Sequence, residues 1–272
     1  MSSKSELILS SSSPDSNPKN QLSKSFLDFK FQNISLSITM SRYADVHLNT
    51  SGPGDARPTA IQIIKDEGVE GKLNGKVIVI TGTSSGIGIE TARALSLTGA
   101  KLLLTARNLN KAKTALEGIL ESGRVELVEM DNNSLSSVRA GAKEILQKSN
   151  NQVNILVNNA GIMALPKLEL TEDGFEKQFG VDHLSHFLLF ELLKPALLAS
   201  ASPEFSSRVV IVASSAHHVA SINESAITIL RRLITMNGLH MDKPKPPIYT
   251  WPTKSSDATD PEGFTPQVFI LE

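Results

Sequence analysis

A glycine-rich turn between an apolar run and a helix-forming segment constrains the fold of this chain more than any other feature. Residues 76–81 are rich in Val and Ile, and they lead directly into Gly82-Thr83-Ser84-Ser85-Gly86-Ile87-Gly88. A helical pattern follows at 90–97. Glycines at this spacing let backbone approach a pyrophosphate closely, and the start of a helix adds N–H donors and a positive dipole end. The sequence therefore predicts a phosphate cradle over 82–88.

The segment downstream of the turn alternates between short apolar runs and stretches of helical periodicity. This alternation is typical of βαβ units, and strands covered on both faces are rich in Val, Ile and Leu. It predicts an α/β fold, a Rossmann-type doubly wound parallel sheet. After residue 221 the pattern stops, so the sheet is expected to be incomplete after the fifth strand, which would be an exposed apolar edge. The expected strands are 76–81, 101–105, 124–130, 153–158 and 208–213, and the expected helices are 90–97, 110–120, 135–148 and 174–198.

Composition divides the chain into four parts. Residues 1–39 are Ser-rich and predict a disordered leader. Residues 40–72 form an N-terminal extension, with Met40 as a candidate start residue. Residues 73–222 are the nucleotide-binding domain, and residues 223–272, rich in proline, predict an irregular or disordered tail.

Charge, cysteine usage and hydropathy exclude several classes of protein. A net charge of -1 without a basic cluster argues against nucleic acid as a partner. The absence of cysteine excludes disulfides and thiolate metal sites and fits the cytoplasm. No apolar stretch has the length of a membrane span. The sequence thus predicts a cytoplasmic protein that acts on a small molecule, with no metal site, and it leaves homo-oligomerisation open.

The glycine-rich turn and two later segments together resemble one enzyme family. Thr81 to Gly88, the segment Asn158-Asn159-Ala160-Gly161 and the segment Val181 to Phe187 are similar to the short-chain dehydrogenase/reductase (SDR) family, closest to its retinol-dehydrogenase-like or fungal members. The resemblance covers about 73–218 and implies hydride transfer between a nicotinamide cofactor and an alcohol or carbonyl substrate. Retinoid, steroid and polyketide-like carbonyl compounds are all compatible with it. The cofactor-binding residues it implies are Gly82, Ser84, Ser85, Gly86, Ile87, Gly88, Arg107, Asp131, Asn132, Asn158, Asn159, Ala160 and Gly161, with Asp131 at the adenine and Asn158 to Gly161 at the nicotinamide ribose.

Arg107 distinguishes between the two nicotinamide cofactors. It follows the second expected strand, where NAD-binding enzymes tend to carry an acidic residue for the ribose hydroxyls. A guanidinium can instead fork onto a 2′-phosphate and stack on adenine, so NADP is expected rather than NAD. The alternative is a solvated arginine at the start of a helix.

The resemblance implies two catalytic residues. Ser214 occupies the position of the serine that orients the carbonyl, with Ser215 as the runner-up and a structural serine as the alternative. Asp182 fills the place of an asparagine that holds a water. His183 and His186 lie three apart on the same expected helix, and we expect them to pack rather than to bind metal.

The acid/base tyrosine and its lysine are missing from the position that the family requires. The chain has only Tyr43 and Tyr249, and Tyr249 precedes Lys254 by five positions, whereas Tyr-x-x-x-Lys needs four. Pro252 also prevents a regular helix there. Two interpretations follow: an NADP-dependent enzyme whose tail is truncated or frame-shifted near Ala226, or a catalytically dead nucleotide-binding fragment. A shifted reading of the codons permits E-W-T-A-Y-G-Q-A-K, which resembles the missing helix.

Overall fold

The computed structural model describes residues 42–214 and 264–271. They belong to two compact units, one ending at Arg57 and one beginning at Pro58. The predictions for residues 1–39, Ser215, Tyr249 and Lys254 lie outside the described residues. Among the described helices, none has both the length and the apolar character needed to cross a bilayer.

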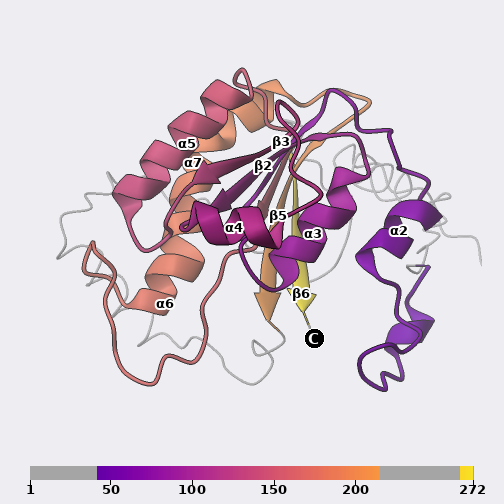
Figure 1. Ribbon diagram of the computed structural model, residues 1–272, viewed down its shortest axis with the longest axis horizontal. Coiled ribbons are helices and arrows are strands. Elements are labelled where there is room, and N and C mark those ends of the chain that lie inside the picture. Colours follow the sequence, from indigo (N-terminus) through magenta and orange to yellow (C-terminus); the bar gives the residue numbers. More distant parts are fainter. Residues whose placement is uncertain (1–41, 215–263, 272) are drawn as a thin grey trace, which may run out of the picture. The chain divides into compact units, whose positions relative to one another are not determined.

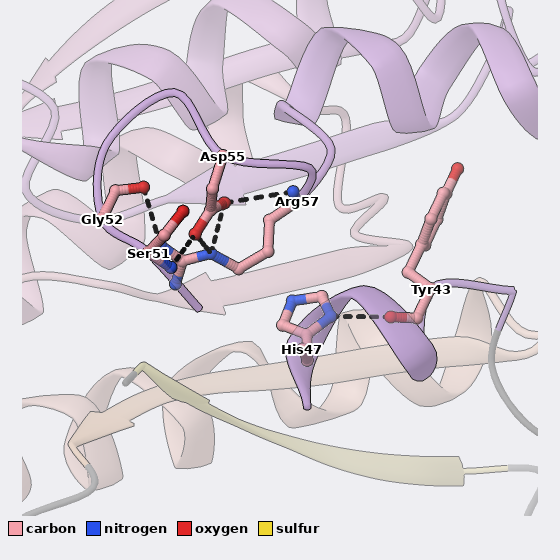
Figure 2. A network of polar contacts seen from close by, with 6 residues as sticks. All are labelled: Tyr43, His47, Ser51, Gly52, Asp55 and Arg57. Carbon is pink, nitrogen blue, oxygen red and sulfur yellow. Dashed lines mark hydrogen bonds and ion pairs between the residues drawn. The ribbon is translucent and has the colours of Figure 1, made fainter. Parts of the chain in front are cut away.

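The described part of the first unit is held together by local polar contacts (Figure 2). The Asp55 carboxylate accepts the backbone N–H of Ser51 at 3.0 Å and the Nε–H of Arg57 at 2.9 Å. The Arg57 side chain holds the pKa of Asp55 well below its usual range. A 3-10 turn, η1 (Asp45–His47), precedes this loop, and the His47 ring donates to the carbonyl oxygen of Tyr43 at 2.8 Å. These contacts all lie between residues 43 and 57.

The second unit is an α/β domain built on a six-stranded parallel sheet in the order β3-β2-β1-β4-β5-β6 (Figure 1). The doubly wound parallel sheet predicted from the sequence is thus confirmed, and the strand order reverses between β1 and β4. The strands are β1 (Val77–Ile80), β2 (Lys101–Ala106), β3 (Val125–Glu129), β4 (Ile155–Asn158), β5 (Ser207–Ser214) and β6 (Phe264–Leu271). The helices are α2 (Ala60–Asp66), α3 (Ile87–Ser96), α4 (Leu109–Ala115), α5 (Leu135–Lys148), α6 (Lys177–Phe179), the π-helical turn η2 (Gly180–Leu184) and α7 (Ser185–Ala199).

Alternation along β1 explains why helices cover both faces of the sheet. Val77 and Val79 pack with the apolar side chains of α5 and α7, whereas Ile78 and Ile80 pack with those of α3 and α4. All four β1 residues are buried. Full burial of each such side chain contributes roughly 1.5–3 kcal/mol to stability.

Two sequence predictions about the sheet and its helices are corrected by the structure. The tail at 223–272 was expected to be irregular or disordered, yet β6 pairs with β5, so β5 is not the edge strand. Pro266 lacks an N–H, and an edge strand tolerates that loss. The helix expected at 174–198 is interrupted: Gly174 has a φ of 82°, and the regular α-helix begins only at Ser185.

Candidate functional site

The loops that leave β1 and β4 meet where the strand order reverses, and glycine makes their close approach feasible. A Cβ on Gly82 would lie 2.6 Å from the Cα of Ala160. A Cβ on Gly88 would collide with the carbonyl oxygen of Gly82 and lie 2.7 Å from Nδ2 of Asn159. Both glycines are therefore required by contacts with backbone and with the β4 loop.

The turn between β1 and α3 leaves backbone available to an anion. Gly86 precedes α3 with a φ of 64°, and a Cβ there would meet no atom within 4 Å. Ser85, Gly86 and Ile87 are exposed, and Ser84 is half-buried. The first N–H groups of a helix have no intrahelical acceptor. These residues fit the pyrophosphate of a dinucleotide, because donors and a positive helix end face open space at this turn.

The hydroxyl of Thr81 connects the two loops. Its Oγ1 accepts the backbone N–H groups of Asn159 and Ala160, each at 2.9 Å. Asn159 returns a bond from Nδ2 to the Thr81 carbonyl oxygen at 2.8 Å. Thr81 is fully buried. The sequence pattern marked Thr81 only as part of the family-like segment Thr81 to Gly88. The feature that could have singled it out is its position as the last residue before the glycine-rich turn.

The remaining predicted cofactor residues lie at the ends of β2, β3 and β4. Arg107 is exposed just after β2. Asp131 accepts the N–H of Asn133 at 2.9 Å. Asn132 is buried, with its amide nitrogen 3.2 Å from Nε2 of His186. Asn158 is also buried, and its Oδ1 has no hydrogen-bond partner in the part of the chain that the structure describes.

A loop that precedes η2 supports the turn between β3 and α5. The carboxylate of Asp173 accepts the N–H of Leu135 at 2.8 Å, and Glu172 donates its N–H to the carbonyl oxygen of Asn133 at 3.2 Å. Ser134, the residue that caps α5, makes no side-chain capping bond. Asp173 thus supplies the capping acceptor from 38 positions further along the chain.

The predicted catalytic residues sit in η2 and at the end of β5. Asp182 lies in the π-helical turn, and its Oδ1 accepts the N–H of Ile162, just after the Asn158-to-Gly161 segment, at 2.9 Å. Ser214 ends β5 and is exposed. Asp182 therefore contacts the β4 loop, whereas its predicted role in holding a water and its partnership with Ser214 stay predictions.

The two histidines of this segment have different surroundings. His183 stacks on Phe179, with ring centroids 5.3 Å apart. His186 is buried, with Nε2 2.9 Å from Oγ1 of Thr81. Each ring thus has contacts of its own, and the described residues contain no group of three or more potential metal ligands.

Partial burial raises the pKa of Asp182 to about 6, from an ordinary value of 3.8, against the opposing hydrogen bond from Ile162. A raised folded-state pKa means that the folded protein binds the proton more tightly than the unfolded chain. Stability from this group is therefore fully present below about pH 4 and is lost as the pH rises through about 6.

Asp182→Asn is expected to stabilise the protein at neutral pH. The amide keeps an oxygen for the Ile162 N–H and carries no charge. A shift of this size corresponds to at most about 3 kcal/mol. Because the carboxyl is partly exposed, we expect about 1 kcal/mol. Thermal unfolding of both proteins between about pH 4 and 8 measures the difference, which should vanish at the acid end. A difference that persists or grows in acid contradicts the assigned pKa.

Comparisons with known proteins show which family this chain resembles. A family model described as short chain dehydrogenase matches residues 76–227. The chain is 54% identical over 181 residues to the short-chain dehydrogenase/reductase prx1 of Penicillium roqueforti, covering 66% of this chain and 53% of that protein. It is 43% identical over 192 residues to the oxidoreductase calI of Penicillium decumbens, covering 68% and 55%. The chain thus spans about half the length of these curated relatives.

The chain is also similar to a solved structure. The RhlG/NADP active-site complex of Pseudomonas aeruginosa is 26% identical, with a TM-score of 0.47, and the match covers 61% of this chain and 69% of that one.

Proposed function

This chain belongs to the short-chain dehydrogenase family, and from that premise we propose that it binds NADP in preference to NAD and acts on an alcohol or carbonyl substrate. A bound reduced nicotinamide would supply a hydride to the carbonyl carbon while the oxygen takes a proton from solvent, so that the carbonyl becomes an alcohol and the cofactor is oxidised. The residues proposed to hold the dinucleotide are those at the ends of β1 to β4. Cysteine-free composition supports a reducing compartment, and we propose the cytoplasm.

The position of Arg107 carries the choice of cofactor. The glycine-rich turn is bonded to the end of β2, because the N–H of Gly82 and the hydroxyl of Thr83 both donate to the carbonyl oxygen of Thr105, at 3.1 and 3.2 Å. Arg107 follows two residues later, exposed, and forms no hydrogen bond or ion pair with any other described residue. A free guanidinium beside the phosphate-binding turn suits a 2′-phosphate.

The loop after β4 supports an apolar substrate. Met163 and Leu168 are about four-fifths exposed, and Leu170 is more than half exposed. They follow the segment that Asp182 contacts through Ile162. Exposed apolar side chains gathered in one loop beside a polar site indicate a surface for an apolar ligand body. We therefore propose a carbonyl compound with a largely apolar skeleton.

NADPH binding followed by carbonyl-dependent oxidation of NADPH tests the function. Titration of the full chain, monitored by the fluorescence of the reduced nicotinamide, should show saturable binding. Turnover with apolar ketones or aldehydes then supports the enzyme. Binding without turnover favours the noncatalytic nucleotide-binding alternative, since the spacing of Tyr249 and Lys254 does not match Tyr-x-x-x-Lys. A chain that binds neither NADPH nor NADH contradicts the proposal.

Arg107→Ala is expected to weaken NADPH binding about 30-fold and to leave NADH binding within about twofold. The loss corresponds to the roughly 1.5–3 kcal/mol of charged hydrogen bonds to a phosphate. Parallel titrations with the two reduced cofactors measure it. Arg139→Ala, which removes an exposed arginine from α5, is the matched control and should change neither affinity. Equal losses for both cofactors would mean that Arg107 does not read the 2′-phosphate.

A further inference from the structure

His186 is buried at the centre of a hydrogen-bond network that joins three loops of the site. Its Nδ1 lies 3.1 Å from the carbonyl oxygen of Asp182, in the π-helical turn. Its Nε2 lies 2.9 Å from Oγ1 of Thr81, at the end of β1, and 3.2 Å from Nδ2 of Asn132, after β3. One imidazole thus contacts the segment of Asp182, the glycine-rich turn and the loop after β3.

The partners of the imidazole determine where its proton resides. A carbonyl oxygen can only accept, so Nδ1 carries the hydrogen and donates it to Asp182. In the neutral ring Nε2 is then an acceptor with a single lone pair, which faces the Thr81 hydroxyl at 2.9 Å and, at the longer distance of 3.2 Å, the amide nitrogen of Asn132. His186 is thereby the neutral Nδ1–H tautomer. Burial agrees, since it lowers the pKa of His186 to about 4.

The hydroxyl of Thr81 has a single orientation in this network. Its oxygen already accepts two backbone N–H groups, from Asn159 and Ala160. Its one hydrogen can go to Nε2 of His186 at 2.9 Å or to the carbonyl oxygen of Val157 at 3.5 Å, and the shorter contact has the better geometry. The acceptor on His186 therefore directs the Thr81 hydroxyl, and the lone pairs of that hydroxyl hold the start of the β4 loop.

We propose that His186 is a positioning residue that aligns the β1 and β4 loops for the dinucleotide through Thr81. The nucleotide part of this inference rests on the proposed function, whereas the alignment of the loops does not. This role requires a hydrogen-bond acceptor at the position of Nε2 as well as a side chain with the volume of the ring. A purely packing role would require only a side chain of similar size.

Two substitutions distinguish the contributions of the two ring nitrogen atoms. In His186→Gln the side-chain oxygen can occupy the place of Nε2 and accept from Thr81. In His186→Asn the shorter amide reaches the place of Nδ1 and keeps the bond to Asp182, but it leaves Thr81 without its acceptor. His183→Asn, in the same segment and stacked on Phe179, is the control for the substitution itself.

Amide hydrogen exchange of the full chain, at Asn159 and Ala160, reads the alignment without any nucleotide. His186→Asn is expected to exchange at least about tenfold faster at these two amides, while His186→Gln and His183→Asn stay within about threefold of the parent chain. The dissociation constant for NADPH should rise about tenfold in His186→Asn alone.

Each outcome decides for or against the inference. Unchanged exchange in His186→Asn overturns it, and so does equal damage in His186→Asn and His186→Gln, because equal damage indicates packing. If the parent chain does not bind NADPH, the proposed function fails, and the exchange rates at Asn159 and Ala160 still decide whether His186 aligns the loops.

Discussion

Gly88→Ala is expected to abolish measurable dinucleotide binding and to lower the free energy of unfolding by about 3 kcal/mol. The added methyl would occupy the space of the Gly82 carbonyl oxygen and would lie 2.7 Å from Nδ2 of Asn159. Neither neighbour can move freely, because Gly82 is bonded to β2 through Thr105 and Asn159 is bonded to Thr81. The β1 turn and the β4 loop must therefore separate, and the phosphate cradle opens.

Gly161→Ala is the matched control for this loss of stability. Gly161 lies in the same β4 loop, its φ is not positive, and a Cβ there would be 3.6 Å from Oδ1 of Asp182, an ordinary contact. We expect its unfolding free energy to change by no more than about 0.5 kcal/mol. Chemical denaturation measures both variants, and NADPH titration measures binding of Gly88→Ala. Parent-like stability in Gly88→Ala would show that the loops are not in close contact.

The parts of this fold that were predictable from the sequence are those set by local pattern. The helix expected at 135–148 has the same bounds as α5, because its apolar positions repeat at helical spacing and Gly141 fits against Met130. The first five strands lie within one or two residues of their apolar runs. Local pattern suffices where burial alone decides the conformation.

The parts that were not predictable depend on contacts between distant residues. Asp173 caps α5 from another loop, and no pattern near Leu135 indicates it. The π-helical turn before α7 begins at Gly180, where a Cβ would collide with the side chain of Thr171 from the preceding loop. The helix expected at 110–120 ends at Ala115, and Gly118 then has a φ of 81°. Periodicity carries no information about such neighbours.

The candidate site shows the same division. The glycines of the turn and the segment from Asn158 to Gly161 were recognisable because their spacing resembles a known family. Thr81 was given no role of its own and His186 was expected only to pack, since their importance lies in which atoms they bring together across β1, β4 and α7. Asn132 was expected at the cofactor, and the structure directs its amide to His186 instead, so its contact with the cofactor stays a prediction.

Thr81→Val should be the most damaging isosteric substitution in the site, with a loss of about 3 kcal/mol in unfolding free energy. Valine keeps the shape of threonine but leaves the N–H groups of Asn159 and Ala160 without their acceptor in a partly buried place. Each unsatisfied buried group costs about 1–3 kcal/mol. NADPH binding should weaken at the same time, because these N–H groups fix the loop proposed to contact the nicotinamide ribose.

Thr83→Val controls for the loss of a buried hydroxyl. Thr83 is equally buried, but its hydroxyl only donates, to a carbonyl oxygen of Thr105 that also accepts two backbone N–H groups. No hydrogen-bonding group is left unsatisfied, so the free energy of unfolding should fall by at most about 1 kcal/mol. Thr81→Ser, which keeps the hydroxyl, should lie near the parent. Thr81 and His186 act through one hydrogen bond. His186→Asn should therefore lower the free energy of unfolding less in the Thr81→Val background than in the parent chain. Additive losses, or equal losses in the two valine variants, would mean that the Thr81 hydroxyl does not join the two loops.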